Sequence, residues 1–95
     1  MDMLAPHESL LVGTWIRDQN GNTVSDDTEK RIEWLIGLRL TRLATNEFGT
    51  LDLDNADGRK WDLTYARSAR HGYGPATLTC VSDEIAKTKY GIGKG

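Results

Sequence analysis

The chain has 95 residues, of which 38% are hydrophobic and 27% are charged, and its formal net charge is −2. This length allows one folded domain, and the composition argues against intrinsic disorder. The mild negative charge and the lack of any block of Lys and Arg exclude the usual phosphate-binding surface, so we expect no nucleic-acid partner.

Cysteine content and hydropathy indicate where the protein works. Cys80 is the single cysteine, so no disulfide can form within the chain. Residues 1–8 lack the basic and apolar segments of a secretory signal, and no apolar run approaches the roughly 20 residues of a membrane span. We therefore expect a cytoplasmic protein without a membrane partner. It would be a single domain over residues 1–95, with residues 1–8 as a loose leader and residues 92–95 as a frayed end.

The first predicted element is a strand followed by a turn. Residues 10–16 are β-prone but contain Gly13, which indicates a bulge or a close approach of two backbone segments. Residues 18–22 contain an Asn-Gly pair, which favours the positive φ angles of a tight turn.

A helix is predicted over residues 26–36. Either Ser25 or Asp26 can cap its first turn by accepting hydrogen bonds from free backbone N–H groups. Apolar residues recur at spacings of three and four, which gives the helix one apolar stripe. We expect Gly37 to end the helix in the left-handed conformation.

The hydrophobic period changes from 3.6 to 2 after this helix. We predict four strands joined by short turns, except for a loop over 66–75, and then a final helix. The strands are 39–45, 50–54, 60–65 and 77–81, and the helix runs from Ser82 to Tyr90 and ends at Gly91. The order strand, helix, four strands, helix predicts an α+β fold with an antiparallel sheet of about five strands. The main helix would cover one face and leave the other face polar.

Alternation within the strands predicts which side chains face the core. The inward residues would be Leu51, Leu53, Trp61, Leu63, Tyr65, Leu78 and Cys80. The outward residues would be Asp52, Asp54, Asp62, Thr64, Thr77 and Thr79. The outer sheet face is therefore predicted to be polar and locally acidic.

No group of residues in the sequence predicts catalysis. A calcium loop starting at Asp52 would place Ala56 at a ligand position and Asp57 where glycine is required, which favours a hairpin turn instead. An inward thiol such as that of Cys80 is usually inert. Two histidines and one cysteine at no ligand spacing give no zinc site. We predict no enzyme activity, no metal and no cofactor.

Two surface features remain as candidate binding sites. The acidic sheet face is compatible with a solvated surface or with docking of a basic partner. The loop after residue 65 carries residue types common at binding hot spots, although an ordinary connection explains it as well. The acidic start of the helix, at residues 26–29, is the next candidate. The predicted contact residues are Asp52, Asp54, Asp62, Arg70, His71 and Tyr73.

Five segments in order resemble one known family. They are Leu11–Trp15, Arg31–Leu35, Asp57–Tyr65, His71–Pro75 and Glu84–Gly91. The most specific are Arg-Ile-Glu-Trp-Leu and Asp-Gly-Arg-x-Trp-x-Leu-Thr-Tyr. Over about residues 10–91 the chain resembles the small bacterial immunity-protein family numbered twenty-seven, which belongs to polymorphic toxin systems.

This resemblance implies a function as an immunity protein, or antitoxin. Such proteins are encoded beside a toxin, bind its C-terminal toxic domain and protect the producing cell and its kin. Neutralisation by binding needs no catalytic group. Two alternatives stay open, namely an adaptor or structural protein-binding module and a small enzyme whose site forms only in a dimer. The resemblance assigns no contacts, and we explain Trp15, Trp34, Trp61 and Tyr65 as core or strand-pairing residues.

Overall fold

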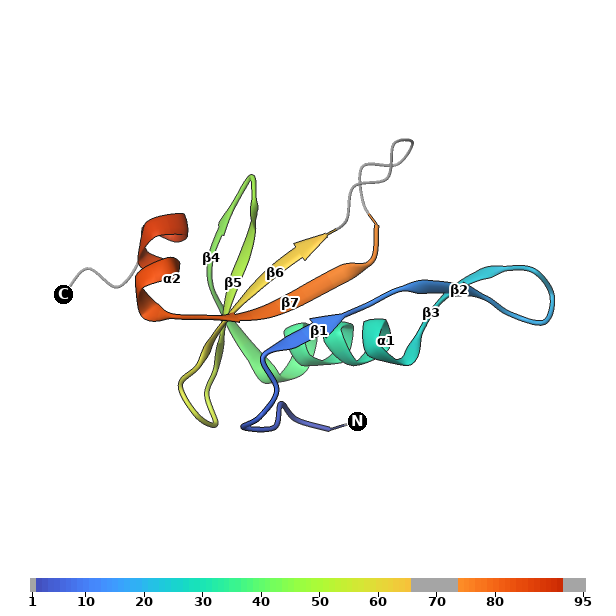
Figure 1. Cartoon of the computed structure of the whole chain (residues 1–95), viewed down its shortest axis with the longest axis horizontal. Helices are drawn as coiled ribbons and strands as arrows, with labels where there is room; N and C mark the ends of the chain where they lie inside the picture. The colour runs from blue at the N-terminus through green and yellow to red at the C-terminus, as the bar shows by residue number, and fades with distance from the viewer. Residues whose placement is uncertain (1, 66–73, 92–95) are drawn as a thin grey trace.

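The computed structural model describes residues 2–65 and 74–91, and it has the predicted α+β architecture (Figure 1). The described strands are β1 (Leu10–Val12), β2 (Trp15–Arg17), β3 (Thr23–Ser25), β4 (Leu40–Asn46), β5 (Gly49–Asp54), β6 (Lys60–Tyr65) and β7 (Ala76–Val81). The described helices are α1 (Asp27–Trp34), its π-helical continuation η1 (Leu35–Arg39) and α2 (Asp83–Tyr90).

The main sheet is antiparallel throughout, with the strand order β1-β7-β6-β5-β4. This confirms the predicted five-stranded sheet. The predicted strand over residues 10–16 is two strands, because β2 leaves the main sheet and pairs with β3 in a separate hairpin. β3 has only three residues, too few to give a periodic signal in the sequence.

Gly13 marks the point where the chain leaves the main sheet. Its N–H donates to the carbonyl of Ala76 at 2.8 Å. A Cβ atom at Gly13 would lie 2.2 Å from the Glu29 Oε1 atom and 3.0 Å from the Ala76 carbonyl oxygen. Glu29 is only 4% exposed, and its Oε1 accepts a hydrogen bond from the Ala76 N–H at 2.8 Å. The predicted close approach is therefore confirmed, with a buried carboxylate as the neighbour.

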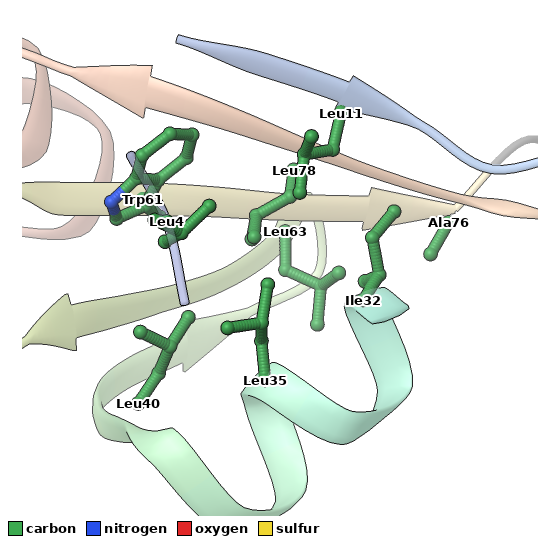
Figure 2. Close-up of a cluster of buried hydrophobic side chains, with 9 residues drawn as sticks. All are labelled: Leu4, Leu11, Ile32, Leu35, Leu40, Trp61, Leu63, Ala76 and Leu78. Atoms are coloured by element: carbon green, nitrogen blue, oxygen red, sulfur yellow. The ribbon is translucent and has the colours of Figure 1, made fainter. Parts of the chain in front are cut away.

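The hydrophobic core lies between α1 and one face of the main sheet, which we call the core face (Figure 2). Trp61 on β6 is fully buried there, as predicted, and Cys80 is its cross-strand neighbour on β7. The cluster comprises Leu4, Leu11, Ile32, Leu35, Leu40, Trp61, Leu63, Ala76 and Leu78. Tyr65 shares this face but lies at its end, where it is 44% exposed.

The N-terminal segment 2–8 packs against the domain, in contrast to the expected loose leader. Leu4 enters the core, with 7% of its surface exposed. Arg31 forms two hydrogen bonds of 2.7 Å with the Glu8 carboxylate and donates to two further backbone carbonyls of the segment. This pairing lowers the pKa of Glu8 to about 2. Arg59 donates to two more carbonyls of the segment, at 2.6 and 2.9 Å.

The ends of α1 confirm one prediction and contradict another. Asp26 is the N-cap, and its Oδ1 accepts from the Glu29 N–H at 2.7 Å. Gly37 does not end the helix in a left-handed conformation, because it lies inside η1 and its φ is not positive. The helix widens into a π turn that closes when the Leu40 N–H donates to the Leu35 carbonyl.

The second helix covers part of the opposite sheet face, which we call the back face. Ser82 caps α2 and Gly91 ends it with φ 70°, as predicted. The helix packs against β4 and β6, and Ala86 on it is 1% exposed. The prediction that this face stays polar is wrong at this place, because Leu51 faces it and is fully buried.

A substitution of Gly13 tests the close approach to Glu29. We expect Gly13→Ala to lower the free energy of unfolding by about 1–3 kcal/mol, because Glu29 must move and the Ala76 N–H loses its buried acceptor. Denaturant unfolding measures the change. Gly37→Ala is the matched control, since a Cβ there meets no atom within 4 Å. Equal stability of the two variants would contradict this account.

Candidate functional site

The predicted acidic sheet face does not exist as one surface. Asp52 and Asp54 are each 1% exposed and lie on the core face. Residues directly opposite in an antiparallel pair point to the same side, and the register pairs Asp52 with Trp61 and Leu51 with Asp62. The two buried aspartates and Asp62 therefore lie on opposite faces. The sequence prediction failed because alternation fixes which residues share a face but not which face is buried.

Burial changes the acid–base behaviour of Asp52. Removal of its carboxylate from water raises its pKa from 3.8 to about 6. The positive charge of Arg42, its cross-strand neighbour on β4, lowers this pKa by a smaller amount. The Oδ2 atoms of Asp52 and Asp54 and the indole Nε1 of Trp61 are buried without hydrogen-bond partners. Asp54 also accepts the Ala56 N–H at 2.9 Å, which helps to form the β5–β6 turn.

Asp62 points away from the core face, as predicted, but two residues of α2 bind its carboxylate. The Tyr90 hydroxyl donates to Oδ1, and the Lys89 ammonium lies 2.7 Å from Oδ2. Burial and then the bond to Asp62 raise the pKa of Tyr90. Asp62 therefore fastens α2 to the back face. The other predicted contacts, Arg70, His71 and Tyr73, lie outside the described residues.

The acidic start of α1 is also largely structural. Asp26 caps the helix and binds Thr14, and Glu29 is buried against Gly13. Among these acids, Asp27 alone is exposed.

No metal centre or membrane-crossing helix is found in the described part of the chain. It contains no group of three His, Cys, Asp or Glu side chains that could hold a metal ion. Asp57, a residue of the rejected calcium motif, instead binds Arg59 at 2.6 Å. No helix within residues 2–65 and 74–91 is long and apolar enough to cross a membrane.

Exposed apolar side chains gather on β1 and β2. Ten large hydrophobic residues are exposed among those described, and four of them fall within residues 10–16. We call these four the apolar strip: Leu10, Val12, Trp15 and Ile16, which are 54%, 50%, 45% and 50% exposed. Leu10 and Val12 share one side of β1, whereas Trp15 and Ile16 alternate on β2. Exposed apolar patches mark interaction surfaces more often than single exposed apolar residues do. Trp15 was predicted to be a core or strand-pairing residue, and it pairs with Ser25 but is not in the core.

The second half of the strip lies on a projecting hairpin, residues 15–25, which we call the arm. Figure 1 shows the arm reaching out beyond the main sheet and α1. All three residues of β2 are exposed. A shallow groove of about 330 Å³ lies beside the arm and is lined by Trp15, Thr23, Val24 and Ser25. None of these four lining residues is charged, so the groove suits an apolar or neutral side chain.

The base of the arm is held by Asp26. Its Oδ2 accepts from the Thr14 hydroxyl at 2.5 Å, and its N–H donates to the Thr14 carbonyl at 2.9 Å. Because the same carboxylate caps α1, the direction of the arm is tied to the helix. These hydrogen bonds, first that from the Thr14 hydroxyl, lower the pKa of Asp26. The arm is therefore short but held at its base.

The structure is a small α+β domain with a projecting hairpin and exposed apolar side chains. The family model described as Immunity protein 27 matches residues 18–82, which is most of the chain and includes the turn and second strand of the arm. The chain belongs to this family of immunity proteins. No curated protein and no solved structure matches it.

A neutral substitution of Asp52 tests the effect of burying its carboxyl group. The folded-state pKa lies above 3.8, so the contribution of Asp52 to stability is intact below about pH 4 and falls as the pH rises through 6. The change from 3.8 to about 6 corresponds to about 3 kcal/mol as an upper value. We expect Asp52→Asn to raise the melting temperature at pH 8 and to leave it nearly unchanged at pH 4. A variant destabilised equally at both pH values would contradict this.

Proposed function

We propose that this protein binds the toxic domain of a toxin encoded beside it and neutralises that domain in the cytoplasm of the producing cell. The observation that carries the proposal is membership of the immunity-protein family over residues 18–82. Such a role requires a surface that recognises another protein and no reactive group.

The surface chemistry supports recognition of a protein. The apolar strip offers a Trp side chain, a residue type enriched at binding hot spots, on an element with a fixed base. The side chain of Cys80, the one thiol of the chain, packs against the core beside Trp61. Its orientation supports a structural role and not that of a nucleophile.

The predicted contact residues contribute to this proposal unequally. Arg70, His71 and Tyr73 remain proposed contacts, since loops of this composition favour binding. Asp62 is engaged by Lys89 and Tyr90, so its proposed contact would depend on α2. Asp52 and Asp54 are buried, and we do not propose them as contacts.

Co-expression tests the function directly. The C-terminal domain of the toxin encoded by the adjacent gene is produced in a bacterial strain with and without this protein. We expect growth only when the protein is present, and we expect the two purified chains to elute as one complex in size-exclusion chromatography. A toxin from an unrelated locus is the control and should remain toxic. Continued toxicity of the adjacent-gene toxin, with no complex, would favour an adaptor module without a toxin partner.

A further inference from the structure

Both faces of the arm carry exposed apolar side chains. The register pairs Trp15 with Ser25 and Ile16 with Val24, so Trp15 and Ile16 point to opposite sides of the hairpin. They are 45% and 50% exposed. An isolated two-stranded hairpin is marginally stable in water. A partner that covered only one face of the arm would leave either Trp15 or Ile16 in solvent.

The arm carries no net charge. Residues 15–25 contain one cation and one anion, Arg17 and Asp18. Arg17 donates to the Gly21 carbonyl at 3.1 Å. The Asp18 carboxylate accepts from the N–H groups of Asn20 and Asn22 at 2.8 and 3.0 Å. Both charged groups thus form hydrogen bonds within the arm, and apart from Arg17 at the end of β2 the two strands carry only apolar and neutral polar side chains.

The free strand edges strengthen the case for a binding role. β2 and β3 pair with each other, and neither is a strand of the main sheet. Proteins usually protect such edges with lysine, proline or inward charges. Neither strand contains lysine or proline, and Arg17 at the end of β2 is the one charged residue in the two strands. The edges can therefore accept a strand or loop of a partner.

We infer that the arm inserts into an apolar cleft of the toxin domain, with Trp15 and Ile16 as anchors on its two sides. This inference rests on the proposed function and adds to it the element that binds and the chemistry of its receptor. The cleft must enclose the arm, because the anchors point in opposite directions. It needs no strongly basic wall, because the one cation and the one anion of the arm leave it without net charge.

A second copy of this chain fits the arm less well. In a symmetric pair each arm meets its twin through the same face, so one of the two anchors stays in solvent. A toxin domain can enclose the arm and also contact the apolar strip on β1.

Calorimetric titration with a catalytically inactive form of the adjacent-gene toxin domain tests the inference. Trp15→Ser and Ile16→Glu each alter one face of the arm. We expect each to weaken binding by about 30-fold or more. Phe48→Ser is the matched control, since this side chain is 66% exposed in the β4–β5 turn, and it should change the affinity less than about threefold. Raising NaCl from 0.1 to 0.5 M should change the wild-type affinity little.

The results of this titration distinguish which element binds, whether its receptor is a cleft, and whether the partner is the toxin or a second copy. Wild-type affinity in both arm variants would overturn the arm as the binding element while the proposed function stands. Loss in one variant alone would indicate a flat contact and overturn the enclosing cleft. A wild-type dimer that both substitutions dissociate would assign the arm to a second copy. A wild-type protein that does not bind the toxin would remove the proposed function, and this inference with it.

A measurement on the unmodified protein guards against loss of folding in the variants. We expect amide hydrogen exchange of residues 15–25 to slow on addition of the inactive toxin domain, because both faces and edges of the arm become covered. Unchanged exchange in this segment within a formed complex would overturn the inference.

Discussion

The buried carboxylate of Glu29 holds α1 against the edge of the main sheet, and the position of the other elements depends on this contact. It accepts the Ala76 N–H where β1, β7 and α1 meet, and it occupies the space that a side chain at Gly13 would need. The helix, the edge of the sheet and the start of the arm are thereby held by one group. A buried carboxylate is costly unless it is hydrogen-bonded, so this junction favours a single arrangement.

Asp26 extends this junction to the surface. It caps α1 and also binds both the hydroxyl and the backbone of Thr14, one residue after Gly13. The chain therefore leaves the main sheet at Gly13 in a direction set by the helix. A hairpin of two three-residue strands has little stability of its own, and its orientation comes from this anchored base.

The residues that carry the family resemblance mainly build the fold. Arg31 and Arg59 hold the N-terminal segment by its carbonyls and by Glu8. Ile32 and Trp61, from the same two motifs, are fully buried. These motifs therefore identify the family through its architecture. Trp15 ends the resembling segment Leu11–Trp15, where it was explained as a core or strand-pairing residue, and Ile16 lies just outside that segment.

The α+β class, most element boundaries, both helix N-caps, the end of α2 at Gly91 and the close approach at Gly13 are predictable from sequence, because they depend on local periodicity and backbone sterics. The sequence by itself did not determine which face of β5 is buried. Leu51 and Asp52 alternate, and only the pairing of Asp52 with Trp61 and the presence of α2 on the back face decided that both residues are buried. The arm likewise depended on tertiary structure, since exposure of Trp15 follows from where Glu29 and Asp26 direct the chain.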